Sequence, residues 1–147
     1  ITPVPLRISF EPPIIKLVNK TENSIKSDIK IDAGQIDLRS IEIVVLCDPK
    51  RIKNLTITQK RDRYSALSYA FADFQAVINQ QACEGTLSVK IPSENPGQRG
   101  SGIIAELTAT VLGSAPSDII ILPQSTGTTD DPSLQFQTQR VNLELTP

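Results

Sequence analysis

Residues 40–49 read Ser-Ile-Glu-Ile-Val-Val-Leu-Cys-Asp-Pro. Two sets of side chains alternate along this stretch. The first set is aliphatic: Ile41, Ile43 and Val45. The second set is mixed: Ser40, Glu42, Val44 and Leu46. Because successive side chains of a strand point to opposite faces of a sheet, the alternation predicts a β-strand with one face on a core. The Asp48-Pro49 pair predicts the turn that ends this strand.

The same alternation recurs outward from this stretch, toward both ends of the chain. It is found in residues 6–10, 25–33, 54–58, 86–91 and 103–111. Residues 119–122 are apolar on both sets of positions and predict a covered strand. Prolines, 11 in all, stand between the runs and oppose a helical bundle. The sequence therefore predicts one domain over residues 1–147, an all-β, two-sheet antiparallel sandwich of jelly-roll or Greek-key type with about nine strands.

Two segments are less regular. In residues 65–80, Leu67, Phe71 and Ile78 fall at helical spacing, while the alternation in residues 67–73 also fits a strand. Two short strands are the favoured interpretation, with a helical turn as the alternative. In residues 134–145 the apolar positions change from even to odd numbers, which predicts a bulge or a sheet-switching kink near residues 137–140.

The composition excludes several classes of function. The chain has no His, no Met and no Trp, only two Cys, and a net charge of -1. Without His there is no imidazole base for a catalytic triad and no His-ligated metal, so we expect no enzyme, no metal and no cofactor. The near-neutral charge argues against nucleic acid as a partner. No apolar run approaches the roughly 18 residues that a membrane span needs, so we expect no membrane span.

The two cysteines, Cys47 and Cys83, predict a disulfide. The bond would close a loop of about 36 residues and contribute about 3–4 kcal/mol in the chain-entropy model. The alternative is two buried thiols that act as small hydrophobic side chains. The disulfide is favoured because the rest of the sequence is typical of an extracellular protein.

Three stretches together resemble cohesin modules, the β-sandwich domains that bind dockerins in cellulosomes and belong to a superfamily shared with carbohydrate-binding modules. The first comprises residues 6–10 and 25–33. The second is the apolar strand of residues 40–47, followed by Asp48-Pro49 and then Ile52. The third runs from residues 85–89 to residues 100–108, as a strand, a loop, a Gly and a long strand. The resemblance covers nearly the whole chain and is closest to cohesin-like domains outside cellulosomes, on surface proteins.

The resemblance implies a non-catalytic module that recognises another protein through one sheet face. The partner it implies is a dockerin-like module. By position, the outward side chains of the quoted strand would contribute: Ser40, Glu42 and Val44. The alternative is an ordinary solvated strand face. The module is expected to be extracellular or at the cell surface.

Charged residues are unevenly distributed along the chain. A basic cluster follows the Asp-Pro turn: Lys50, Arg51, Lys53, Lys60, Arg61 and Arg63. It would suit an acidic partner, an anionic glycan or a neighbouring subunit, and its alternative is a solvated hairpin whose lysines protect an edge strand. Beyond residue 100 acidic residues prevail, which allows head-to-tail stacking of copies. The aromatic side chains are mostly expected in the core, so a flat sugar-binding platform is not expected.

Three further sites follow from local motifs. Asp130 and Asp131 are candidates for calcium, although their Thr- and Gly-rich surroundings are typical of a loop. Asn19 and Asn54 begin glycosylation sequons.

Residues 1–5 are either a linker or an extended arm. As an arm they would enter a neighbouring copy, with Ile1, Val4 and Leu6 as the inserted side chains, although Pro3 and Pro5 would interrupt the hydrogen-bond ladder. Such strand exchange, or head-to-tail contact, defines the alternative function: a structural subunit of an extracellular filament or surface layer, with copies of itself as the partner.

Overall fold

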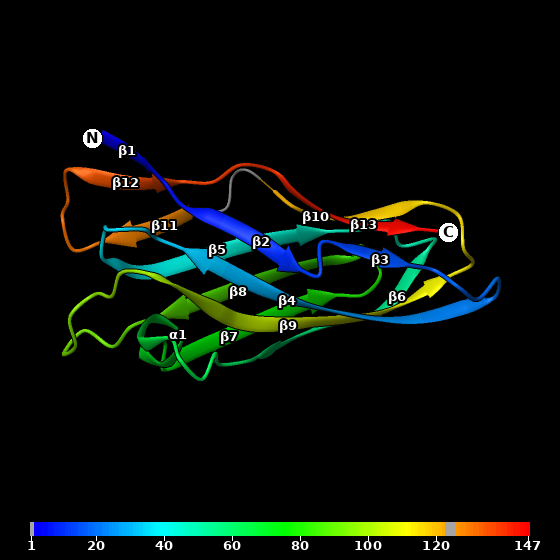
Figure 1. Ribbon diagram of the computed structural model, residues 1–147, viewed down its shortest axis with the longest axis horizontal. Helices are drawn as coiled ribbons and strands as arrows, with labels where there is room; N and C mark the ends of the chain where they lie inside the picture. The colour runs from blue at the N-terminus through cyan, green and yellow to red at the C-terminus, as the bar shows by residue number, and fades with distance from the viewer. Residues whose placement is uncertain (1, 123–125) are drawn as a thin grey trace.

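The alternating segments fold into two facing sheets in the computed structural model of the chain, which describes residues 2–122 and 126–147 (Figure 1). One sheet has four strands: β2 (Arg7–Glu11), β4 (Glu22–Asp32), β9 (Ser101–Leu112) and β6 (Ile52–Gln59). The other has nine: β1 (Thr2–Pro5), β3 (Ile14–Lys16), β5 (Leu38–Leu46), β7 (Asp73–Asn79), β8 (Glu84–Lys90), β10 (Ser117–Ile121), β11 (Thr126–Thr129), β12 (Leu134–Gln137) and β13 (Val141–Thr146). The predicted all-β sandwich is confirmed.

The nine-stranded sheet is built around β5, the strand of the quoted stretch. β8 pairs with β5 along one side, and β7 pairs with the outer side of β8. The other side of β5 is shared, with β11 along its first half and β10 at its last residues. β12 and then β1 continue outward from β11, while β13 and then β3 continue outward from β10. On this side of β5, each position in the sheet is therefore occupied by two short strands in place of one long strand: β11 and β10 first, then β12 and β13, then β1 and β3.

The strand count in the described residues exceeds the expected nine because short strands were missed. β1, β3 and β11 have no alternation of their own, and β11 lies in the Thr- and Gly-rich stretch that is typical of a loop. They are strands because each forms a hydrogen-bond ladder with a neighbouring strand: β1 with β12, β3 with β13, and β11 with β5. The predicted irregularity near residues 137–140 is present as the break between β12 and β13, and both halves stay in the same sheet. The two pairs β1–β12 and β13–β3 are parallel, an exception to the antiparallel expectation.

Residues 65–80 contain both of the structures considered. A short helix, α1 (Ala66–Ala70), comes first, and β7 follows. The favoured interpretation of two strands was therefore wrong for the first half and right for the second. Ser65 caps the helix by accepting the N–H of Ser68 on its hydroxyl (3.1 Å). No helix among the described residues has the length and hydropathy needed to cross a membrane.

A single hydrophobic core joins the inward faces of both sheets. It contains the aliphatic set of β5 and the inward residues of β4 and β9, all close to fully buried. Of the aromatic side chains, Phe10, Phe71 and Phe136 are buried, as expected for core residues. Both tyrosines lie outside the core. With the inward faces committed to packing, the outward sheet faces and the ends of the sandwich are available for recognition.

Candidate functional site

The outward face of the nine-stranded sheet contains the three residues suggested as a partner-binding face. Ser40, Glu42 and Val44 alternate with buried neighbours on β5, and each is at least partly exposed. Their partners on β8 lie directly opposite, with Ser40 beside Lys90, Glu42 beside Ser88 and Val44 beside Thr86. The next row comes from β7, whose outward residues lie opposite those of β8: Asp73, Gln75, Val77 and Asn79. The sheet thus brings the side chains of three strands onto one surface, where the charged Glu42, Lys90 and Asp73 stand among small polar and aliphatic residues.

Aliphatic side chains interrupt this polar surface. Val77 on β7 is 62% exposed, one of the most exposed large hydrophobic residues of the described chain. Ile120 of β10 is paired with Leu46 of β5, and both are half-buried on the outward side. Residues 119–122 were predicted to form a covered strand. Ile119 and Ile121 are indeed buried on the inward side, whereas Ile120 on the outward side is partly exposed.

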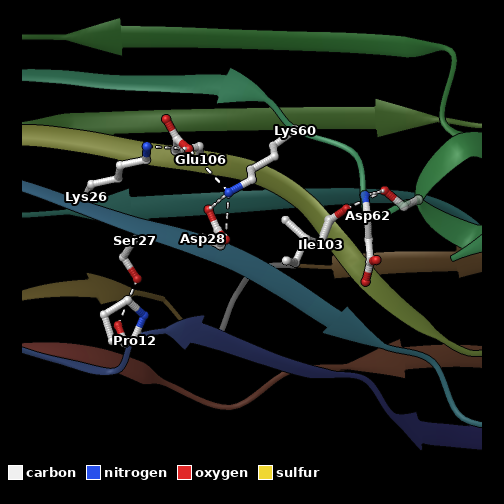
Figure 2. A network of polar contacts seen from close by, with 9 residues as sticks. Pro12, Lys26, Ser27, Asp28, Lys60, Asp62, Ile103 and Glu106 are labelled. Carbon is white, nitrogen blue, oxygen red and sulfur yellow. Dashed lines mark hydrogen bonds and ion pairs between the residues drawn. The ribbon is translucent and has the colours of Figure 1, made fainter. Parts of the chain in front are cut away.

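The outward face of the four-stranded sheet is different, because ion pairs cross it. The Lys60 ammonium is 2.9 Å from Asp28 and 3.5 Å from Glu106, and Figure 2 shows it pointing between these two carboxylates. Lys26 also reaches Glu106, at 3.5 Å. The hydrogen bond to Asp28, assisted by the charges of both acids, raises the pKa of Lys60 above its ordinary value. This face also carries two more ion pairs, Lys30–Glu11 and Lys53–Glu22.

The basic cluster does not form one patch. Lys50 and Arg51 precede β6 and Lys53 is its second residue, whereas Lys60, Arg61 and Arg63 follow its end. The eight residues of the strand span about 26 Å. Several of these cations are also engaged within the chain. The Arg51 guanidinium donates to the carbonyls of Leu112 (2.8 Å) and Ala115 (2.7 Å), and Lys60 belongs to the network described above.

The N-terminal segment does not extend away from the molecule. β1 pairs with β12 of the same chain, and the Leu6 N–H donates to the Gln137 carbonyl (2.9 Å). Leu6 is only 3% exposed and belongs to the chain's own core, and Val4 packs against that core. The expectation of an arm with Val4 and Leu6 free for a neighbour is therefore corrected. Ile1 lies outside the described residues.

The predicted disulfide is present between Cys47 and Cys83, whose Cα atoms are 5.1 Å apart. Cys47 directly follows β5 and Cys83 directly precedes β8, so the bond lies at the end of the β5–β8 pair. The Cys47 N–H donates to the Cys83 carbonyl (2.9 Å), which extends the ladder by one step. The bond fixes the end of the two strands that carry most of the candidate face.

The carboxylates of Asp130 and Asp131 already accept hydrogen bonds from other residues of the chain. One oxygen of Asp130 is 2.5 Å from Nε of Arg39, and the other accepts the Gly97 N–H (3.0 Å). These two hydrogen bonds, the Arg39 bond first, lower the pKa of Asp130. Asp131 accepts the hydroxyl and the N–H of Ser133, which lower its pKa as well. Within residues 2–122 and 126–147, no group of His, Cys, Asp and Glu side chains is arranged to hold a metal.

Both sequon asparagines, Asn19 and Asn54, are exposed. Asn54 has a positive φ of 56° at the bulge where β6 shifts register against β9. The structure places both sequons at the surface, and glycosylation stays a prediction.

Sequence reasoning missed two groups of exposed side chains. Val77 and Ile120 join the β5 face through pairings between strands far apart in the chain, which alternation within one strand does not reveal. Tyr64 and Tyr69 were grouped with core aromatics, although Tyr64 stands next to the basic residues 60–63 in the sequence. That adjacency was the available signal that the tyrosine belongs to a polar surface loop.

No family model matches the sequence, and the search of curated proteins found no match. Solved structures do match. The chain is similar to the seventh ScaB type I cohesin of Pseudobacteroides cellulosolvens, with a TM-score of 0.70 and 10% identity, over 97% of this chain and 91% of that one. It is also similar to the third ScaC cohesin of Acetivibrio cellulolyticus, solved in complex with the ScaB dockerin, with a TM-score of 0.69 and 10% identity, over 97% of this chain and 99% of that one.

A type II module shows the same likeness. The second type II cohesin of the ScaA scaffoldin of Acetivibrio cellulolyticus has a TM-score of 0.60 and 13% identity, over 93% of this chain and 95% of that one. At such identities the likeness is one of fold. The chain has a cohesin-like β-sandwich fold, as the sequence resemblance implied.

Proposed function

We propose that residues 1–147 form one non-catalytic protein–protein recognition module, and that its partner docks on the outward face of the nine-stranded sheet around β5, β8 and β7. The observation that carries this proposal is the contrast between the two outward faces. Five of the seven ion pairs between described residues cross the four-stranded face. None joins the outward side chains from Ser40 to Leu46 on β5, or those of β7 and β8, to one another.

This contrast matters because binding removes water from a surface. Charged groups are costly to bury unless the partner satisfies them again, and the cores of protein interfaces are accordingly depleted of charge. Small hydroxyl and aliphatic side chains, such as Ser88, Thr86 and Val77, are cheaper to desolvate. The two inner strands of this face, β5 and β8, are each paired on both sides, so little conformational entropy is lost when a partner docks.

The partner class we propose is a dockerin-like module. The support is the shared fold, since the similar ScaC cohesin was solved bound to a dockerin. The disulfide is in keeping with a secreted or cell-surface parent protein, because such bonds persist in oxidising compartments.

The experiment is a calorimetric titration against a panel of dockerin modules that includes the ScaB dockerin. The key variant is Val77→Arg, which places a charge on the β5 face. We expect it to weaken binding by about tenfold or more, because an exposed aliphatic side chain of the face is replaced by a charge that the partner would have to desolvate. Glu42→Lys, on β5 itself, should also alter the affinity.

The matched control is Val18→Arg, the same substitution at a valine that is 76% exposed and lies between β3 and β4. It should bind like the wild type. Equal binding by all variants would refute the location of the site, and failure of every dockerin to bind would refute the partner class. Sedimentation of the chain alone at high concentration tests the alternative, because a filament subunit or other self-assembling chain would form oligomers.

A further inference from the structure

A second surface with the character of a binding site lies at the end of the sandwich that carries α1. The segment between β6 and α1 presents Arg61, Arg63 and Tyr64, and α1 itself presents Tyr69. Tyr64 is 91% exposed and Tyr69 is 55% exposed. We call these four residues the Arg–Tyr patch. Arg and Tyr are among the residue types most enriched at the centres of protein interfaces.

The arginines of the patch are not neutralised by ion pairs. Among residues 2–122 and 126–147, neither Arg61 nor Arg63 makes one. Each stacks on a tyrosine instead, with Arg61 5.5 Å from the ring centroid of Tyr69 and Arg63 6.0 Å from that of Tyr64. The one acid of this segment, Asp62, accepts the Tyr64 N–H (3.2 Å). The patch is therefore positively charged, and its donors remain available to carboxylates.

A recess adjoins the patch. It has a volume of about 420 Å³ and lies between α1 and the segment that follows β8. Most of its lining is apolar, contributed by Ala66, Ala70, Ile91 and Pro96, with Tyr69 at the boundary to the patch. Two amide side chains from the segment after β8 complete it. A volume of this order accommodates an apolar side chain.

The patch is rigidly supported. The Ser65 hydroxyl donates to the Ser101 carbonyl (2.6 Å), and the Ser68 hydroxyl donates to the Ile103 carbonyl, which fixes α1 to β9. Ser68 also accepts the Asp62 N–H (2.8 Å), so the loop and the helix are held together, as Figure 2 shows at Asp62 and Ile103. A surface that is already ordered loses less entropy on binding.

We propose that the Arg–Tyr patch binds an acidic peptide segment of a partner protein. The carboxylates pair with Arg61 and Arg63, and an apolar side chain of the segment enters the recess beside Tyr69. A peptide is favoured over a polysaccharide because each tyrosine ring already has a guanidinium over one face, where a sugar would stack. This site does not depend on the β5 face, and its residues are not among those varied to test that face.

Intrinsic fluorescence provides a direct measurement. The chain has two Tyr and no Trp, so all of its tyrosine emission arises from Tyr64 and Tyr69 in the patch. The probe is the capped peptide Glu-Glu-Leu-Glu-Glu, titrated at low ionic strength. We expect a saturable change in emission that weakens when salt is raised to about 0.15 M, because partly exposed charge pairs are screened. Glu-Glu-Gly-Glu-Glu, which cannot fill the recess, should bind more weakly, and Lys-Lys-Leu-Lys-Lys should not bind.

The double variant Arg61→Gln, Arg63→Gln should lose about tenfold in affinity for the acidic peptide. The matched control is Lys50→Gln, which removes an exposed cation at the opposite end of β6 and should bind like the wild type. Circular dichroism melts establish that each variant is folded. The proposal is overturned if the acidic peptide produces no saturable change up to millimolar concentration, or if both arginine replacements leave its affinity intact. Saturation by polygalacturonate without saturation by the peptide would overturn it in favour of an anionic glycan.

Discussion

At the scale of single residues, Gln80 replaces a missing strand partner. β6 shifts register against β9 between Lys53 and Thr56, so Leu55 has no partner in that ladder. The side-chain amide of Gln80 supplies both hydrogen bonds, accepting the Leu55 N–H (3.1 Å) and donating to the Leu55 carbonyl (2.7 Å). Because Gln80 follows β7 of the nine-stranded sheet, this side chain also links the two sheets.

We predict that Gln80→Leu lowers the free energy of unfolding by about 1–3 kcal/mol, because the buried Leu55 backbone loses both partners. Urea-induced unfolding measures the change. Gln81→Leu is the matched control, since Gln81 is the adjacent exposed glutamine, and it should leave the midpoint nearly unchanged. If the two variants unfold at the same urea concentration, the Gln80 bonds are not stabilising.

At the scale of elements, the attachment of α1 to β9 explains why Gly102 is a glycine. A Cβ at position 102 would lie 2.1 Å from Oγ and 2.7 Å from Cβ of Ser65. Those Ser65 atoms are constrained, because its hydroxyl caps α1 and bonds to the Ser101 carbonyl. The strand and the helix cap can approach this closely only without a side chain between them.

Gly102→Ala should therefore destabilise the fold by about 1–3 kcal/mol, the usual cost of overpacking. The double variant Ser65→Gly, Gly102→Ala should cost less than the sum of the two single changes, because Ser65→Gly removes the clashing atoms. Thermal or urea unfolding of all three proteins measures the coupling. Simple additivity would mean that the two positions do not interact.

The same elements show what the sequence predicts and what it does not. The strand of residues 40–46 and its outward set Ser40, Glu42 and Val44 follow from alternation alone, because burial on one face imposes a period of two. The helix at residues 66–70 does not, since its alternation also fits a strand. It is fixed by Ser65 and Ser68, whose hydroxyls bond to β9 carbonyls near the bulge in the β4–β9 pairing. Such long-range partners have no local signature, and the same holds for Val77 on the candidate face.

At the scale of the whole molecule, the disulfide closes the segment that crosses between the sheets. Between Cys47 and Cys83 the chain leaves the nine-stranded sheet, forms β6 in the four-stranded sheet and α1 on β9, and returns as β7. The bond spans 36 positions of the sequence. The crosslink therefore restricts a loop that touches both layers of the sandwich, and its loss increases the freedom of the unfolded chain.

We predict that the double variant Cys47→Ala, Cys83→Ala folds with a free energy of unfolding about 3–4 kcal/mol below that of the wild type, the value expected for a loop of this length. Guanidinium unfolding without reductant measures the difference. The wild type should approach the stability of the variant when dithiothreitol is added, whereas the variant should not respond to it. The native fold should persist in the variant, because the Cys47 N–H to Cys83 carbonyl bond and the whole β5–β8 ladder do not depend on sulfur. The β5 face should then keep its binding after reduction, so a loss of binding without a loss of folded structure would show that the crosslink positions the face itself.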